Sequence, residues 1–184
     1  WKKYRKLQTN LFGAHQIRNA SIALTTLEIL SEKGYLIRES SIQSGLMSVE
    51  WPGRLEFLSI NGQRAHPTVL LDGAHNPSGM KTVVAFLKEF KGVKKWKVLL
   101  SVASGKAIDE MLGLLALVAD EIVICKMNNS RSIDPEKETS NLFKSHEDAN
   151  KFATTSLSAF EAYQNLLRKL QSEEGLLVTG SLYL

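Results

Sequence analysis

The seven residues 71–77, Leu-Asp-Gly-Ala-His-Asn-Pro, combine residue types that suit a ligand-binding turn. The pattern predicts an apolar strand that ends at Asp72, a glycine turn, and a helix that begins at the proline. Ligands of open parallel sheets bind beyond the carboxyl ends of the strands, and a helix N-terminus there favours anions. Asp72 could accept hydrogen bonds from ribose hydroxyls or a metal-bound water, and His75 would lie at the mouth of the same crevice. The simpler alternative is that Asn76 caps the helix and that Asp72 and His75 are ordinary loop residues.

Three further segments hold polar side chains with chemical uses. Arg54 follows a Trp-Pro-Gly breaker and could bind phosphate through both prongs of its guanidinium. His15 and Asn19 are four residues apart, so they share one helix face and could read the edge of a base. Ser181 follows an apolar strand and Gly180, where the backbone can approach a ligand closely. Each segment also has an ordinary alternative: a surface arginine beside a proline turn, solvated and capping positions on a helix, and a tight turn.

Other well-known catalytic patterns fail because their spacing is wrong. Ser-Gly-Lys at 104–106 resembles part of a phosphate loop, but Leu100 stands where that loop needs glycine and Ala107 where it needs Ser or Thr. No serine lies in a nucleophile elbow. The four histidines, at positions 15, 66, 75 and 146, lack the spacing of metal ligands. We therefore predict no metal site within this chain.

The composition is that of a globular chain with a mild excess of positive charge. Of its 184 residues, 43% are hydrophobic and 23% are charged, and its apolar stretches are far shorter than the roughly 18–20 residues of a membrane helix. The net charge is +4, but Lys and Arg are spread along the chain, which argues against nucleic acid and suits polyanionic small ligands. Cys125 is the only cysteine, so we expect a buried structural thiol in a cytoplasmic protein. Because the chain begins with Trp and stops within an apolar run, we expect it to be a piece of a longer protein.

Hydrophobic periodicity divides the chain near residue 50. Before that point, residues 4–12 could form a short strand or an ordered arm, and helices are expected over about 14–30 and 39–47. Trp-Pro-Gly at 51–53 then interrupts the pattern. Beyond it, an Asn-Gly hairpin turn is expected at residues 61–62.

The rest of the chain alternates between strands and helices. The expected helices are 77–90, 108–117 and 159–171, with a further helix start at Asp134-Pro135. The expected strands are 55–58, 68–71, 96–102, 121–126 and 176–179. This alternation implies crossover units, and hence an α/β fold with a mostly parallel sheet, flanking helices and an antiparallel edge hairpin.

Four segments, taken in their order, resemble one family. They are Gly-x-His-Gln-x-x-Asn-Ala at 13–20, Pro-Gly-Arg-x-Glu at 52–56, Asp-Gly-Ala-His-Asn-Pro at 72–77 and Thr-Gly-Ser-Leu-Tyr at 179–183. This set is similar to folylpolyglutamate synthase and dihydrofolate synthase, within the Mur ligase superfamily. The resemblance implies that residues 1–50 are the end of a central ATPase domain plus a linker. Residues 51–184 would be a carboxy-terminal α/β domain with a six-stranded, mainly parallel sheet.

The resemblance also implies a reaction and a set of binding residues. ATP would activate the carboxylate of tetrahydrofolate as an acyl phosphate, which the amine of L-glutamate attacks. The positions implied for ATP are Arg54 at the phosphates, Asp72 at the ribose, and Asn19 and His15 near the adenine. His75 and Ser181 would border the incoming glutamate, and no catalytic residue is assigned within this chain. The phosphate loop, the Mg²⁺ ligands and most of the folate pocket are expected upstream, in the protein's own amino-terminal P-loop domain.

This sequence departs from the family pattern in two places. The spacing from Arg54 to Asp72 is longer than usual, and Lys106 is followed by Ala107 where relatives commonly carry a Lys-Asp pair, which leaves the role of Lys106 open. Two alternative functions also remain: a Mur-type ligase acting on a cell-wall precursor, and a non-catalytic nucleotide-binding α/β module. A substrate panel distinguishes the first alternative, and the absence of an upstream phosphate loop would indicate the second.

Overall fold

The computed structural model describes residues 3–4, 6–60, 63–64, 67–140 and 147–181. The chain packs as two units, Trp1–Arg54 and Leu55–Leu184. We call them the first and the second unit and describe each by itself. The predicted assignment of residues 1–50 to the end of an ATPase domain, with a boundary at residue 50, stays a prediction.

The first unit consists of two helices and the arm that precedes them. Helix α1 spans Ala14–Glu32 and α2 spans Glu39–Ser48, close to the expected ranges. The described residues of the arm contain no strand. The backbone N–H of Asn10 donates to the carbonyl of Leu46 at 3.1 Å, so the arm is fastened to α2. Of the two interpretations offered for this segment, the ordered arm fits and the short strand does not.

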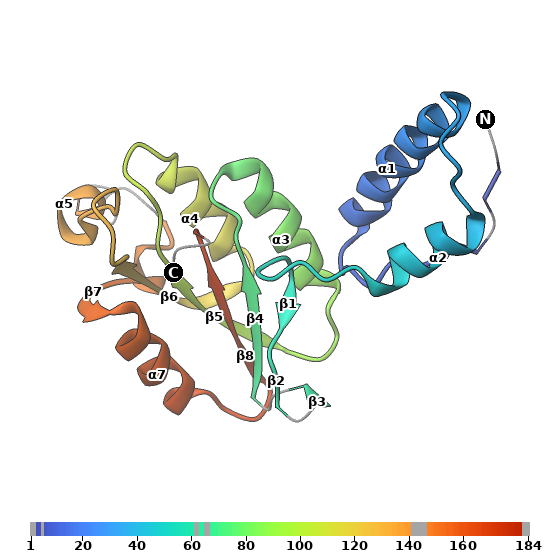
Figure 1. Ribbon diagram of the computed structural model, residues 1–184. Helices are drawn as coiled ribbons and strands as arrows, with labels where there is room; N and C mark the ends of the chain where they lie inside the picture. The colour runs from blue at the N-terminus through green and yellow to red at the C-terminus, as the bar shows by residue number, and fades with distance from the viewer. Residues whose placement is uncertain (1–2, 5, 61–62, 65–66, 141–146, 182–184) are drawn as a thin grey trace. The chain divides into compact units, whose positions relative to one another are not determined.

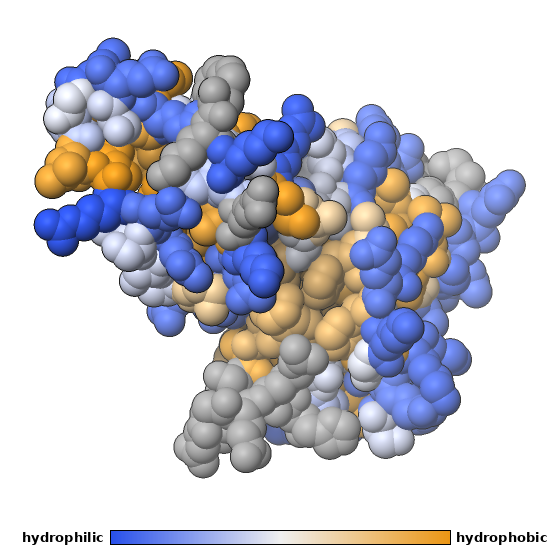
Figure 2. All heavy atoms as spheres, turned by 90° about the vertical axis from the view of Figure 1, so that its right-hand side faces the viewer, coloured by the Kyte–Doolittle hydropathy of each residue, from blue (hydrophilic) through white to orange (hydrophobic). Residues whose placement is uncertain are grey.

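The helices of the first unit expose much of their hydrophobic surface. They bury only Gln16 and Ile42. Hydrophobic side chains reach the molecular surface between hydrophilic ones in the space-filling view (Figure 2). The large exposed hydrophobic residues of this unit are Phe12, Ile17, Ile22, Ile29, Tyr35, Leu36, Met47 and Trp51. Two helices with so few buried contacts gain little stability from packing on each other.

The second unit is built on a six-stranded sheet in the order β1-β4-β8-β5-β6-β7 (Figure 1). Neighbouring strands run parallel except for β1 and β4, which pair antiparallel. A separate two-stranded ribbon joins β2 to β3. The strands are β1 Glu56–Phe57, β2 Ser59–Ile60, β3 Gln63–Arg64, β4 Thr68–Asp72, β5 Lys95–Leu100, β6 Ala119–Lys126, β7 Phe152–Ser158 and β8 Glu174–Thr179. The predicted fold class, a mostly parallel six-stranded sheet with an antiparallel edge, is confirmed.

Three helices cover the two faces of this sheet. Helices α3, Pro77–Glu89, and α4, Ile108–Ala116, lie on one face, and α7, Ala159–Lys169, lies on the other (Figure 1). The chain moves outward across the sheet through α3 and α4 but returns through α7 to insert β8 between β4 and β5. Because crossovers keep one handedness, a change of direction places the returning helix on the opposite face.

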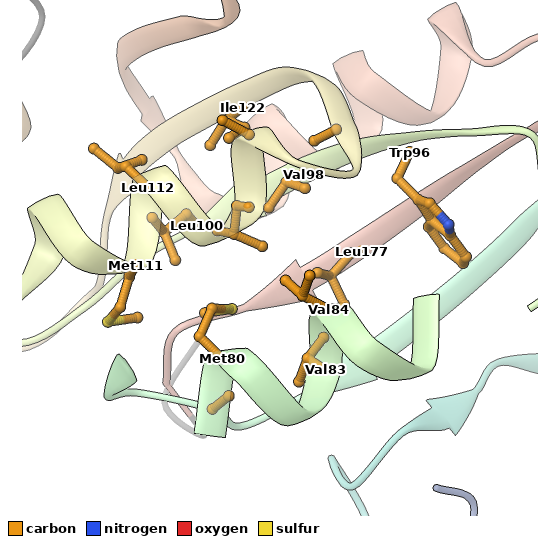
Figure 3. Packing of buried hydrophobic residues seen from close by; sticks show 14 of the residues in the cluster. Met80, Val83, Val84, Trp96, Val98, Leu100, Met111, Leu112, Ile122 and Leu177 are labelled. Atoms are coloured by element: carbon orange, nitrogen blue, oxygen red, sulfur yellow. The ribbon is translucent and has the colours of Figure 1, made fainter. Parts of the chain in front are cut away.

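Regularly spaced apolar residues on the helices form the core. Side chains of α3 and α4 point toward the strands beneath them, as the close-up shows (Figure 3). The residues labelled there that make this contact are Met80, Val83, Val84, Met111 and Leu112 from the helices, and Val98, Leu100, Ile122 and Leu177 from the sheet. A smaller cluster on the other face joins Ala162 and Leu166 of α7 to Val69, Leu99, Cys125 and Leu176.

Two features near the edges of the sheet differ from the predictions or extend them. Strand β7 was not predicted, because its sequence Phe-Ala-Thr-Thr-Ser-Leu-Ser is mostly polar and mostly exposed, as suits an edge strand. The predicted helix start at Asp134-Pro135 is confirmed: α5 spans Pro135–Thr139, and Asp134 accepts a hydrogen bond from the backbone N–H of Lys137 at 3.3 Å. The predicted Asn-Gly turn at 61–62 lies outside the described residues. None of the described helices is long and apolar enough to cross a membrane.

Candidate functional site

Asp72 ends β4 and braces the turns on either side of it. Its side chain is 7% exposed, and its carboxylate accepts hydrogen bonds from the backbone N–H groups of Leu55 at 2.9 Å and Ala74 at 2.8 Å. Leu55 has a left-handed backbone, φ 48°, which costs an L-residue roughly 1–2 kcal/mol. The charged acceptor and the complete burial of the Leu55 side chain offset that cost. Asp72 therefore fixes the backbone immediately after Arg54.

The predicted helix start after Asp72 is present. The side-chain oxygen of Asn76 accepts from the N–H of Gly79 at 2.8 Å, and the proline at position 77 opens α3, so Asn76 is the cap that the simpler interpretation expected. His75 Nδ1 lies 2.9 Å from the carbonyl oxygen of Gly73. A carbonyl can only accept, so Nδ1 carries a proton, and in the neutral form of such a ring Nε2 is an acceptor. The turn thus combines a structural cap with an oriented imidazole.

The strand end beside Asp72 is equally constrained. Gly180 has φ 106°, and a Cβ added there would lie 2.2 Å from the carbonyl oxygen of Ser101. Only glycine fits this close approach between the ends of β8 and β5. The N–H of Ser101 donates to the carbonyl of Thr179 at 3.1 Å, which holds the two strand ends together. The tight turn expected at this position is therefore present. It fixes the backbone position from which the side chain of Ser181 extends.

A cavity of about 260 Å³ lies beyond these strand ends in the second unit. His75 and Ser181, which lie 106 positions apart in the sequence, both line it. The structure therefore brings together the two residues predicted to border glutamate. Lys106, whose role the sequence left open, lines the same cavity, and so does Arg131, which the sequence analysis did not identify.

The first unit contains a separate cavity of about 470 Å³. His15, Asn19 and Arg54 line it, so three of the four residues predicted to bind ATP share one cavity. Asn19 donates from Nδ2 to Oε1 of Gln16 at 2.9 Å, and this bond orients its side-chain amide. The fourth predicted residue, Asp72, belongs to the second unit. Much of the remaining lining is apolar, as is common in ligand pockets: Leu11, Ala20, Ala23, Leu46, Val49 and Trp51.

Two other features of the structure are separate from the predicted residues. A larger hollow of about 1,000 Å³ lies on the α7 face of the sheet, and none of the predicted site residues lines it. Cys125 is buried on that face, and burial raises the pKa of its thiol to about 11, so it stays protonated and unreactive near neutral pH. Among the residues that the structure describes, no three or more His, Cys, Asp or Glu side chains gather as ligands of a metal ion.

Comparison with known proteins identifies the relatives of this chain. The family described as "Mur ligase, glutamate ligase domain" matches residues 53–182. The dihydrofolate synthase/folylpolyglutamate synthase of Bacillus subtilis is 29% identical over 99% of this chain and 40% of its own length. A probable bifunctional folylpolyglutamate synthase/dihydropteroate synthase of Haloferax volcanii is 35% identical over 94% of this chain and 19% of its own length.

Solved structures of folylpolyglutamate synthases from other organisms are also similar to this chain. Folylpolyglutamate synthase of Mycobacterium tuberculosis, complexed with ADP, superposes with a TM-score of 0.80 at 26% identity. The match covers 97% of this chain and 40% of that one. The corresponding enzyme of Thermotoga maritima gives a TM-score of 0.73, also at 26% identity, over 100% of this chain and 39% of that one. The chain thus spans about 40% of the length of these solved relatives and of the Bacillus enzyme.

Proposed function

This chain belongs to the Mur ligase family through its glutamate ligase domain, and on that premise we propose that it is the carboxy-terminal portion of a folylpolyglutamate synthase. The intact protein would be an ATP-dependent amide-bond ligase that adds L-glutamate to tetrahydrofolate, with dihydrofolate synthase activity as a second capacity. The relatives named as folylpolyglutamate or dihydrofolate synthases support this choice over a ligase of cell-wall precursors. The chain alone, which lacks a phosphate loop, would be inactive.

One observation carries the proposal most directly: His75 and Ser181 meet on one small cavity at the carboxyl ends of the sheet. This is where ligands bind in open α/β sheets. The volume of about 260 Å³ is below the 300–1,000 Å³ common for drug-sized ligands, and so suits a small amino acid. We assign this cavity to the incoming glutamate.

The proposed chemistry needs positioning more than it needs acid or base groups. The γ-phosphoryl group of ATP passes to a folate carboxylate oxygen, which gives an acyl phosphate and ADP. The glutamate nitrogen then forms the C–N bond of the amide while the C–O bond to phosphate breaks, phosphate leaves and the nitrogen releases a proton. His75, with Nε2 as an acceptor, suits a hydrogen bond from the amino group and would orient it for attack. Mg²⁺, held by the upstream domain, would neutralise charge on the phosphates.

The nucleotide would use the other predicted residues. The cavity formed by His15, Asn19 and Arg54 supports binding of the adenine at the amide and imidazole and of the phosphates at the guanidinium. Asp72, whose carboxylate accepts the backbone N–H groups of Leu55 and Ala74, is the proposed contact of the ribose. The ADP complex of the Mycobacterium tuberculosis relative supports a nucleotide site in such a protein.

The remaining partner is the protein's own amino-terminal P-loop domain. The exposed hydrophobic side chains of α1 and α2 support a contact of the first unit with that domain, because large apolar surfaces on a helix are normally covered. Folate and glutamate are the substrates in this proposal, and neither nucleic acid nor membrane has a role. The single buried cysteine supports a cytoplasmic location.

The test is an assay of the intact protein with ATP, Mg²⁺, tetrahydrofolate and L-glutamate. We expect ADP, phosphate and a folate whose mass has grown by one glutamate residue, and no turnover by residues 1–184 alone. A parallel reaction with dihydropteroate measures the second activity. If UDP-muramyl peptides support ADP release and folates do not, the protein is a cell-wall ligase and the proposal fails.

A further inference from the structure

Two cavities of the second unit are neighbours at the carboxyl ends of its strands. One is the cavity assigned to glutamate, and the other is the hollow on the α7 face, which we call the α7 hollow. Lys126 and Asn128, at the end of β6, line the α7 hollow. Asn129 and Arg131, a few positions further along, line the glutamate cavity. Of the residues that the structure describes, Met127 alone lines both cavities.

Strand β8, which lies between β4 and β5, passes between the same two cavities (Figure 1). Val178 lines the α7 hollow, where its register neighbours Leu71 and Leu99 complete an apolar floor. Gly180, two positions further along, lines the glutamate cavity. This residue has no side chain, and a Cβ added to it would lie 2.2 Å from the carbonyl oxygen of Ser101. At this point β8 therefore supplies no side chain that could separate the two spaces.

Met127 is fixed at its backbone and buried at its side chain. Its N–H donates to Oγ of Ser132 at 2.8 Å, and Ser132 forms a bridge with Ala103 of the loop after β5. Solvent scarcely reaches Met127, which is 3% exposed. A methionine side chain is long, unbranched and apolar, so it fills an irregular gap well and has no charge with which to bind glutamate. Met127 is therefore placed as a wall between the two cavities.

The two cavities differ in size and in lining. The glutamate cavity has a volume of about 260 Å³ and polar lining residues such as His75 and Ser181. The α7 hollow has a volume of about 1,000 Å³ and adds Leu58, Phe160 and Tyr163 to its apolar floor. Without the side chain of Met127, the smaller space would open into one about four times as large. An amino acid longer than glutamate would then find room.

We propose that Met127 sets the length limit of the amino-acid substrate by closing the glutamate cavity toward the α7 hollow. This inference rests on the proposed function, and it names the residue that excludes longer amino acids from the same site. One extra methylene in a closed apolar pocket changes kcat/KM by about 10- to 200-fold. Removal of the wall should abolish most of that discrimination.

The test uses the intact ligase and compares L-glutamate with L-2-aminoadipate, which is one methylene longer and keeps both carboxylates. Met127→Ala should raise the ratio of kcat/KM for aminoadipate to kcat/KM for glutamate by about 10-fold or more, while the KM for ATP stays the same. Met127→Leu nearly conserves the volume of the side chain and should leave this ratio as in the wild type. Leu99→Ala is the matched control, because it enlarges the α7 hollow and leaves the wall in place, and its ratio should not change.

The outcomes separate this inference from the function beneath it. A wild-type enzyme that does not use glutamate refutes the proposed function. An active wild type that uses both amino acids equally well, or whose ratio stays the same in Met127→Ala, overturns only the role of Met127. An equal rise of the ratio in Leu99→Ala also overturns it, because the cause would then be a general loosening of the core. If Met127→Ala does not fold, as judged by its thermal unfolding, the smaller truncation Met127→Val decides, and an unchanged ratio in that variant overturns the inference.

Discussion

The two units of the chain differ in how much of their hydrophobic surface they bury. Among the described residues, the buried hydrophobic side chains belong to the second unit, with the exception of Ile42. The first unit instead accounts for most of the large hydrophobic side chains that are exposed, including Leu36 at 87% and Ile17 at 67%. Burial of apolar surface is the main favourable term in folding. The second unit therefore has its own source of stability, and the first has very little.

This difference matters for function because each unit contains one candidate cavity. The cavity of the second unit is formed by strand ends and loops that backbone hydrogen bonds fix in place. The cavity of the first unit lies among helices α1 and α2, whose packing is sparse. We infer that the proposed amino-acid site is formed in the second unit by itself, whereas the proposed nucleotide site needs further protein contacts to become rigid.

The largest expected effect comes from separating the units. Residues 55–184 made alone should unfold in one cooperative transition in urea, because their core is complete. Residues 1–54 made alone should show no cooperative transition, because isolated helices of this length are marginal in water. Circular dichroism measured against urea concentration tests both, with residues 1–184 as the control. A cooperative transition for residues 1–54 alone would contradict the comparison.

Two substitutions by alanine, one in each unit, test the same difference in burial within the whole chain. Leu112 is completely buried between α4 and the sheet, so Leu112→Ala should lower the free energy of unfolding by about 2–5 kcal/mol. Ile17→Ala removes a side chain of similar size from α1, where it is 67% exposed, and should change that free energy by no more than about 0.5 kcal/mol. Urea denaturation monitored by circular dichroism at 222 nm measures both. A loss above about 1 kcal/mol for Ile17→Ala would contradict the comparison, because it would mean that the first unit buries this side chain in solution.

Much of the second unit could be predicted from sequence because its elements are amphipathic in a simple way. Met80, Val83, Val84 and Leu87 recur at helical spacing, and the apolar runs of β5, β6 and β8 are typical of strands buried on both faces. Strand β7 was not predicted because an exposed edge strand does not require an apolar pattern. Its Thr and Ser residues are as typical of a loop as of a strand.

The candidate site was only partly predictable for a related reason. His75 and Ser181 stand in short motifs that can be recognised one at a time, and the parallel sheet then places them together. Arg131 lies in a polar loop without such a motif. It enters the cavity because the loops after β5 and β6 pair through backbone groups, which do not depend on side-chain type and leave no sequence signal. The order of the strands could have suggested it, since β6 ends beside β5.

The smallest expected effect concerns a charged cluster at the opposite end of the sheet. Lys97 of β5 is largely buried and donates to Glu121 at 3.0 Å, with Glu174 at 3.9 Å. Burial alone would lower the pKa of Lys97, but the hydrogen bond and charge of Glu121, together with Asp120 and Glu174, outweigh it and raise the pKa above its ordinary value of 10.5. A raised pKa in the folded state means that the charged lysine stabilises the fold below pH 10.5. That contribution is lost as the pH rises through the folded pKa.

We therefore expect the second unit to lose about 0.5–1 kcal/mol of its free energy of unfolding between pH 10 and pH 12, beyond what Lys97→Met loses over the same range. The measurement is urea denaturation at several pH values in a Cys125→Ala background. That background is needed because the buried thiol, with its pKa raised to about 11, also destabilises the fold as the pH rises from 9 to 11. Lys94→Met is the matched control, since Lys94 pairs with Glu173 in an exposed ion pair at 2.6 Å and should add almost nothing. If the free energy of unfolding depends on pH equally in Lys97→Met and in the background protein, solvent screens the Lys97 cluster as it screens a surface ion pair. The cluster would then contribute nothing measurable to the stability of the second unit.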